Sequence, residues 1–196
     1  MSRPFHHGNL RAVLLDEATA VLREHGADAL SLRDLARRAG VSHGAPRSHF
    51  VDRRALLDAL AERGFLRLAE TIRKAAESTP DDFARSLHAA GSAYVAFAAA
   101  EPALLDLMFA AKVDSPSETV HAAAAQLFLV MSDIMATGVA AGVVAAHEAD
   151  RLALLLSATV QGIAGLVTSR RITVAQSEPL IADAIALFLF HKLPEP

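Results

Sequence analysis

The sequence contains no cysteine and no tryptophan, and its aromatic residues are nine phenylalanines and one tyrosine among 196 residues. Without cysteine the chain cannot form a disulfide scaffold, a thiolate zinc site or a cysteine nucleophile. The first residues also lack the apolar segment of a secretory signal peptide, so we expect a cytoplasmic location. Secreted disulfide-rich proteins and thiol enzymes are therefore excluded from the classes to consider.

Alanine dominates what is present: it supplies 42 residues, and 53% of the chain is hydrophobic. Alanine is the strongest helix former, and no segment alternates apolar and polar residues as a strand does. A chain of this length can hold one domain or two small ones. The composition therefore predicts an all-α fold.

The charge is unevenly distributed along the chain. Lysine and arginine outnumber aspartate and glutamate by 13 to 9 from Met1 to Lys74, whereas they number 6 against 13 from Ala75 to Pro196. The first part carries a net +4 and the second a net −7, within a total of −3. A basic head on an acidic body is typical of a nucleic-acid-binding module joined to a regulatory domain, although a charged run can also be a solvated face.

Apolar residues recur at helical spacing in four segments of the basic head. Asn9 is placed to cap the first of them, and His25-Gly26 to end it. The second segment is short, because Ser31 caps it and Gly40 stops it. The expected helices are 10–25, 32–39, a short one that Ser42 caps and that runs toward Phe50, and a long one that Asp52 caps and that continues through Ile72.

Beyond Thr79-Pro80 the sequence consists of long alanine-rich segments separated by proline or glycine. The 18 residues from Leu152 to Ser169 include no charge, which is long enough for a membrane span. Polar residues interrupt this run, and a helix buried on both faces has the same composition, so we expect no span. The expected helices are 81–100, 102–111, 116–141, 148–171 and 178–192.

Two short helices that meet at Gly40 have the layout of a helix-turn-helix, in which the second helix enters the major groove of DNA. Six arginines and two aspartates lie between Ser31 and Arg54, which gives this segment a net +4. The apolar residues occupy the inward positions and leave the basic face to DNA phosphates. Spacing and charge together predict a DNA-binding head.

Several motifs of this head closely resemble the N-terminal domain of the TetR family of transcriptional regulators. They are His6-His7-Gly8-Asn9-Leu10-Arg11, Ser31-Leu32-Arg33-Asp34-Leu35-Ala36-Arg37-Arg38-Ala39-Gly40-Val41-Ser42, His49-Phe50 and Asp52-Arg53-Arg54-Ala55-Leu56-Leu57. The resemblance implies a three-helix DNA-binding domain over 1–54, a connecting helix over 55–77, and a helical regulatory and dimerisation domain over 78–196. It also implies a double-stranded DNA operator and a small-molecule effector as partners.

The same resemblance assigns DNA contacts to the two short helices and their flanks. It implies Ser31 as a phosphate-contacting cap, Arg33 as a candidate base reader, and His49 with Arg53 as contacts to the DNA backbone. The other implied contacts are Ser42, His43, Gly44, Ala45, Arg47 and Ser48.

Two residues of the second short helix depart from expectation. Arg47 stands where the family usually has a tyrosine that packs against the DNA backbone, so it is expected to act through charge. Contact with a phosphate and contact with a guanine edge both remain open. Pro46 lacks an N–H and disfavours a helical conformation at Ala45, and such breaks of local rules tend to occur at functional sites.

A helix-turn-helix this small reads too few base pairs for genomic specificity, so we expect a homodimer. Small residues form one stripe of the predicted helix 148–171, which permits close approach of another helix; ordinary packing within the chain would use the same stripe. The last predicted helix has an apolar face. The residues expected at the dimer interface are Ala158, Gly162, Gly165, Ser169, Ile181, Ile185 and Phe188.

Bulky side chains concentrate in the middle helices of the acidic body, the region that encloses an inducer in the TetR family. A stripe of methionine and aromatic residues is more often an ordinary core than a pocket, so both interpretations stay open for these residues. The pocket candidates are Tyr94, Phe97, Leu104, Met108, Phe109, Phe128, Met131 and Met135. The polar side chains that could orient a ligand are Asp133, Gln126, His121 and Arg85.

We therefore expect a dimeric regulator, most simply a repressor that an effector releases from a palindromic operator. An architectural DNA-binding protein without effector is an alternative, and it would bind DNA regardless of sequence. An α-helical enzyme is a third, but the chain shows no catalytic constellation of nucleophile, acid-base pair or metal ligands. The adjacent His6-His7 lack the spacing of metal ligands, so we expect no metal and no cofactor.

Overall fold

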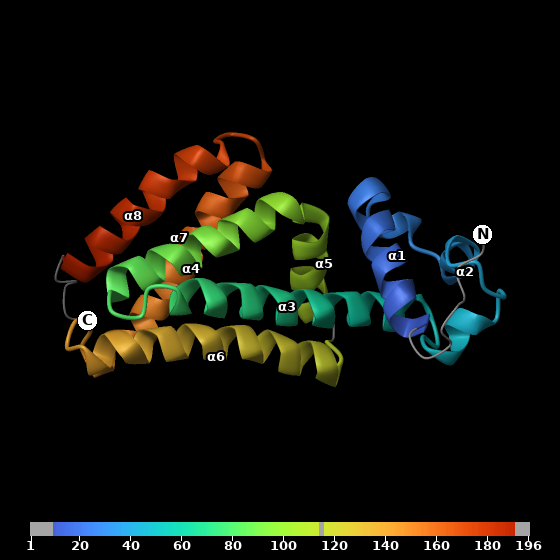
Figure 1. Cartoon of the computed structure of the whole chain (residues 1–196), viewed down its shortest axis with the longest axis horizontal. Coiled ribbons are helices and arrows are strands. Elements are labelled where there is room, and N and C mark those ends of the chain that lie inside the picture. The colour runs from blue at the N-terminus through green and yellow to red at the C-terminus, as the bar shows by residue number, and fades with distance from the viewer. Residues whose placement is uncertain (1–9, 114–115, 191–196) are drawn as a thin grey trace. The chain divides into compact units, whose positions relative to one another are not determined.

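The computed structural model describes residues 10–113 and 116–190, and among these it contains helices and no β-strand (Figure 1). The predicted all-α fold is confirmed. The α-helices in chain order are α1 (Leu10–His25), α2 (Leu32–Arg38), α3 (Arg53–Glu77), α4 (Phe83–Ala100), α5 (Pro102–Val113), α6 (Glu118–Ala140), α7 (Ala149–Thr168) and α8 (Val174–Phe190). The described residues also include the 3₁₀ turns η2 (Ala27–Ala29), η3 (Ala45–Ser48) and η4 (Ala146–Glu148).

The chain divides into two compact units. The first comprises Met1–Gly64 and Ala103–Ala123, and the second comprises Phe65–Pro102 and Ala124–Pro196. Helices α3 and α6 therefore begin in the first unit and end in the second. The functional division at residues 54 and 77 stays a prediction, while the segment between them is one continuous helix, α3.

Polar caps begin two helices of the first unit. The Ser31 hydroxyl accepts a hydrogen bond from the Asp34 backbone N–H at 3.3 Å, and the Asp52 carboxylate accepts one from the Ala55 N–H at 2.8 Å. Each cap satisfies an N–H that has no partner within its helix. Both predicted caps are confirmed, whereas Asn9 lies outside the described residues.

Glycines end α1 and α2. Gly26 and Gly40 have φ of +78° and +67°, the left-handed conformation that glycine adopts without steric cost. After α2 the Gly40 N–H donates to the Arg37 carbonyl at 3.2 Å and the Val41 N–H donates to the Ala36 carbonyl at 3.0 Å. This reciprocal pattern is the Schellman turn, and it confirms the predicted stop between the two elements of the head.

The second element of the head differs from the predicted helix. It is the 3₁₀ turn η3, in which the Arg47 N–H donates to the Gly44 carbonyl at 3.1 Å, and the Ser42 side chain does not cap it. Pro46 has no N–H and restricts the residue before it, and its ring is buried in the head. The prediction of a longer helix capped by Ser42 is therefore wrong in its extent, because the proline outweighs the apolar spacing.

In the second unit, α4 packs against α7 and α8, and these two pack against each other. Gly91 of α4 permits the close approach, because a Cβ there would lie 3.0 Å from Ile181 Cγ2 of α8 and 3.5 Å from Val160 Cγ2 of α7. Gly138 of α6 has a similar role, since a Cβ would overlap the Phe83 ring of α4. Glycine at these positions sets the spacing between helices.

Helix α8 begins at Val174, four residues before its predicted start. The Thr173 hydroxyl accepts from the Gln176 N–H at 3.3 Å, and the Gln176 side-chain carbonyl accepts from the Thr173 N–H at 2.9 Å. This capping box starts the helix, and Pro179 lies inside it. The predicted start at 178 is therefore wrong, and the predicted end at 192 lies outside the described residues.

Two segments, Glu118–Ala140 and Ala146–Thr168, are long and apolar enough to cross a membrane by length and composition alone. In the structure 33% and 28% of their apolar windows are buried inside the chain. Exposed apolar side chains remain on both, including Phe128 on α6 and Leu154 on α7. The apolar run at 152–169 thus leaves part of its surface available to a partner.

Candidate nucleic-acid interface

The residues predicted to meet DNA are nearly all on the surface of the first unit. Ser31 and Ala45 are half-buried. The exposed members are Arg33, Ser42, His43, Gly44, Arg47, Ser48, His49 and Arg53. Pro46 and Phe50 are buried between them and anchor the segment in the core of the head.

Ion pairing distinguishes four of the six arginines of this segment. Arg37 pairs with Asp34 at 2.9 Å, and Arg38 lies 3.7 Å from two glutamates of α1. By contrast, Arg33 and Arg47 form no ion pair or side-chain hydrogen bond with any residue that the structure describes. A guanidinium without an internal partner can direct all five N–H donors to phosphate or base edges.

Arg53 is exposed, but its guanidinium is bonded to other residues of the head. Its Nε donates to the Leu30 carbonyl at 3.1 Å, a terminal nitrogen donates to the Ala27 carbonyl at 2.7 Å, and the Asp28 carboxylate lies 3.8 Å away. These bonds tie the start of α3 to the turn that precedes α2. The predicted contact of Arg53 with the DNA backbone stays a prediction, and its observed contacts are structural.

The turn η3 presents a small reading surface. A Cβ at Gly44 would meet nothing within 4 Å, so its backbone is open to close approach. The Ser48 hydroxyl donates to the Ala45 carbonyl at 2.7 Å, and its oxygen remains able to accept. Because η3 spans four residues and Arg47 is its basic residue, Arg47 is the charge that this turn can bring to DNA.

The histidines of the head do not assemble a metal site in the part of the chain that the structure describes. His43 and His49 are both exposed, and they flank η3 on either side. Across residues 10–113 and 116–190, no three His, Asp or Glu side chains gather as metal ligands would. His6-His7 lie outside these ranges.

The predicted effector-pocket residues are mostly buried in the two units. Phe128 is the exception, with 58% of its surface exposed, and Phe109 and Met131 are half-buried. The buried members are Tyr94, Phe97, Leu104, Met108 and Met135. Burial raises the pKa of Tyr94 to about 12, because the phenolate would lose its hydration. These positions match the core interpretation that the sequence left open, and the pocket role stays a prediction.

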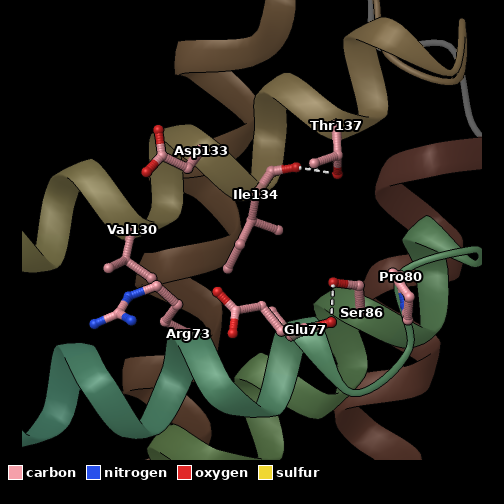
Figure 2. A pocket seen from close by; sticks show the side chains of 9 residues that line it. Arg73, Glu77, Pro80, Ser86, Val130, Asp133, Ile134 and Thr137 are labelled. Atoms are coloured by element: carbon pink, nitrogen blue, oxygen red, sulfur yellow. Dashed lines mark hydrogen bonds between the residues drawn. The ribbon is translucent and has the colours of Figure 1, made fainter.

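A cleft of about 230 Å³ lies in the second unit, between the end of α3, the start of α4 and α6 (Figure 2). Of the four polar side chains proposed to orient a ligand, Asp133 lines this cleft, and His121, Gln126 and Arg85 do not. The lining residues are Arg73, Ala76, Glu77, Pro80, Ser86, Val130, Asp133, Ile134 and Thr137. No sequence pattern links the last turn of α3 to α6, so most of this lining was beyond prediction.

The predicted dimer stripe of α7 is exposed. Its residues are Ala158, Gly162 and Gly165 on α7 and Ser169, which follows the last residue of the helix. A Cβ at either glycine would meet nothing within 4 Å inside the chain. Packing among the described residues therefore does not use this stripe, and they leave its surface open for another helix.

The apolar face of α8 points elsewhere than predicted. Ile181 and Ile185 are 0% and 5% exposed, so they belong to the core of the second unit and cannot meet a partner chain. Phe188 is half-buried. The larger apolar side chains that α8 leaves exposed include Leu180 and Leu187, at 40% and 55%. The assignment of Ile181 and Ile185 to the interface is corrected, because α8 directs them into the core that it forms with α4 and α7.

Comparison with known proteins bears on both units. A family model described as bacterial regulatory proteins of the tetR family matches residues 14–60, and a model of the tetracyclin repressor-like C-terminal domain matches residues 87–188. No curated protein sequence matches the chain.

Solved structures similar to the chain extend over nearly its whole length. A protein of unknown function from Rhodococcus sp. RHA1 is 40% identical, with a TM-score of 0.86 over 97% of this chain and 100% of its own. The TetR family transcriptional regulator PfmR from Thermus thermophilus is 19% identical, with a TM-score of 0.64 over 92% and 99% of the two chains. A bacterial regulatory protein of the tetR family from Rhodococcus RHA1 is 21% identical, with a TM-score of 0.66 over 91% and 97%. The last two likenesses show the fold alone.

Proposed function

Because the chain belongs to the TetR family of bacterial regulatory proteins, we propose that it is a homodimeric repressor that a small-molecule effector releases from a palindromic operator. Membership makes it a DNA-binding transcriptional regulator, and the proposal concerns its assembly, direction and control. Operator binding is the step on which all three depend, and the observation that supports it is the pair Arg33 and Arg47, exposed and without a partner among the described residues, on the two elements of the head.

The order of elements supports entry of η3 into the major groove. In a helix-turn-helix the first helix crosses the DNA backbone and the second element meets base edges. Arg33 in the first turn of α2 is then suited to phosphate or a groove edge, and Ser31, whose oxygen caps α2, can still donate its O–H to a phosphate. Arg47 alone adds positive charge within η3.

The exposed faces of α7 and α8 support a two-fold dimer. Two helices from each subunit would form a four-helix interface. Gly162 and Gly165 allow a partner backbone to approach α7 closely, and Leu154, Leu180 and Leu187 are apolar side chains that such an interface would remove from water.

Control by an effector requires only a difference in affinity between two states. A ligand that binds the DNA-free form more tightly by a few kcal/mol shifts the population away from the operator. Helix α3 is continuous from Arg53 to Glu77, so it links the start of the regulatory body covalently to the end of the head. A shift at one end of this helix is therefore the simplest route to the spacing of two η3 turns in a dimer.

Selection of bound fragments from genomic DNA tests the proposal. The purified chain should retain an inverted repeat and bind it at least about 1,000-fold more tightly than a scrambled duplex at the same salt concentration. Equal affinity for both duplexes would instead show an architectural DNA-binding protein.

A further inference from the structure

The cleft of the second unit has apolar walls, and its two hydroxyl groups, those of Ser86 and Thr137, already donate to backbone carbonyls. Ala76, Pro80, Val130 and Ile134 supply apolar lining. The buried Ser86 donates to the Ala76 carbonyl at 3.0 Å, so its hydroxyl hydrogen is in use. Figure 2 shows the Ile134 side chain extending from α6 toward α3 across this space. The charged rim therefore decides which ligands the cleft prefers.

The arginine at the rim is already paired. Arg73 forms an ion pair with Glu70, one turn earlier on α3, and Lys74 lies 3.2 Å from the same carboxylate. The hydrogen bond from Lys74, with the charges of Arg73 and Lys74, holds the pKa of Glu70 below its usual range. An anionic ligand at Arg73 would have to compete with this ionised carboxylate.

Two carboxylates at the rim have no such partner. Glu77 and Asp133 line the cleft from α3 and α6, and neither forms an ion pair or side-chain hydrogen bond with a residue in the described ranges. Figure 2 shows the Glu77 carboxylate directed into the space between the two helices. Glu77 is also the last residue of α3, where the negative end of the helix disfavours a carboxylate.

We propose that this cleft binds a small organic cation, an amine or amidine with an apolar body, whose positive group pairs with Glu77 and Asp133, and that such a cation is the effector. The binding site stands on the cleft alone, and the effector role rests on the proposed function. Apolar walls would hold the body of the ligand, while two unpaired carboxylates favour a cation over an anion or a neutral molecule.

The volume limits the size of the ligand. A cavity of about 150 Å³ accommodates benzene, so the 230 Å³ cleft fits one ring with a short side arm. Phenethylammonium has this size and charge. Its neutral counterpart 2-phenylethanol and the anion phenylacetate complete a matched set of probes.

Calorimetric titration of the full chain with the three probes tests the binding site. Phenethylammonium should bind more tightly than the other two, and added salt should weaken it. Glu77→Gln should raise its Kd about two- to fivefold, and Glu77→Gln combined with Asp133→Asn about tenfold. Asp81→Asn is the matched control: it removes an exposed charge that does not line the cleft, and it should leave the Kd unchanged.

Thermal unfolding without ligand separates lost binding from lost folding. Glu77→Gln should unfold at the wild-type temperature or slightly above it, because it removes a carboxylate from a helix C-terminus. Equal affinity for the amine and the alcohol, tighter binding of phenylacetate, or an unchanged Kd in the double variant would overturn the cation site.

Operator binding tests the effector role separately. Phenethylammonium at about its wild-type Kd should lower the affinity of wild type for its selected operator, and the double variant should need about tenfold more amine for the same effect. Binding of the amine without any effect on operator affinity would overturn the effector role. Failure of the ligand-free chain to bind any operator would refute the proposed function and leave the cation site standing.

Discussion

The two arginines without internal partners lead to a quantitative prediction about salt. If each half-site engages about four phosphates, a dimer engages about eight, and log K should fall against log salt with a slope of roughly −7. Arg33→Ala removes one phosphate contact per subunit and therefore two per dimer. The slope should then become shallower by about 1.8. Arg47→Ala should have the same effect if Arg47 binds phosphate.

Fluorescence anisotropy of a labelled operator between about 50 and 200 mM salt, a range over which phosphate contacts change affinity by orders of magnitude, measures these slopes. Lys74→Ala is the control, because this exposed cation lies on the part of α3 in the second unit and should leave the slope unchanged. If Arg47 instead contacts a guanine edge, Arg47→Ala should weaken binding to the operator by about 1 to 3 kcal/mol and leave binding to a scrambled duplex unchanged. Wild-type slopes in both arginine variants would refute the assignment of this face to DNA.

Arg53→Ala distinguishes a DNA contact from a structural clamp. Its loss would leave the Leu30 carbonyl without this donor, whereas the Ala27 carbonyl would keep the Leu30 N–H at 3.1 Å, so the head should lose about 1 kcal/mol of stability while the salt slope stays near that of wild type. Chemical denaturation and the same anisotropy series measure the two effects. A stable head with a shallower slope would restore Arg53 to the DNA contacts.

Three further predictions concern the body. Gly162→Arg should yield monomer or aggregate by light scattering, because an unpaired charge buried in an interface costs several kcal/mol. Ala122→Arg changes an exposed residue of α6 and should remain dimeric. A normal dimer of Gly162→Arg would show that Gly162 lies outside the interface. Arg170 has a φ of +61°, which is strained for a residue with a Cβ, so Arg170→Gly should raise the free energy of unfolding measured in urea by about 0.5 to 1 kcal/mol. Arg171→Gly is the control and should not raise it. Equal effects of the two substitutions would contradict the strain. Tyr94, the single tyrosine, should ionise near pH 12 by ultraviolet absorbance; since its folded pKa is raised, the stability it contributes should persist below about pH 10 and be lost as the pH rises toward 12, and ionisation near pH 10 in the folded chain would contradict its burial.

Local chemistry made most of the fold predictable. A cap or a left-handed glycine affects only the backbone within one turn of its own position. The predicted helix starts at Ser31 and Asp52 and the predicted stops at Gly26 and Gly40 are therefore all found in the structure. The all-α fold follows equally from alanine content and apolar spacing. The prediction fails where two local signals compete. Pro46 restricts η3 to four residues, and α8 begins at its cap, ahead of Pro179.

Contacts between distant segments were less accessible to the sequence. An apolar face on α8 does not reveal whether it meets the chain itself or another copy, and Ile181 turns out to pack near Gly91. In the sequence Arg53 resembles the other cations of the head, but in the structure its Nε donates to the carbonyl of Leu30, 23 residues earlier. Glu77 becomes a candidate ligand-binding residue only because α6 places Asp133 at the same cleft. Such pairings depend on tertiary packing, which periodicity does not encode.

A footprint of the chain on its selected operator tests the central claim most directly, since it reports DNA binding, symmetry and the residues involved. We expect two protected half-sites of an inverted repeat, one helical turn apart or a multiple of it, and loss of both protections in the Arg33→Ala, Arg47→Ala double variant. Protection without two-fold symmetry, or full protection by the double variant, would contradict it.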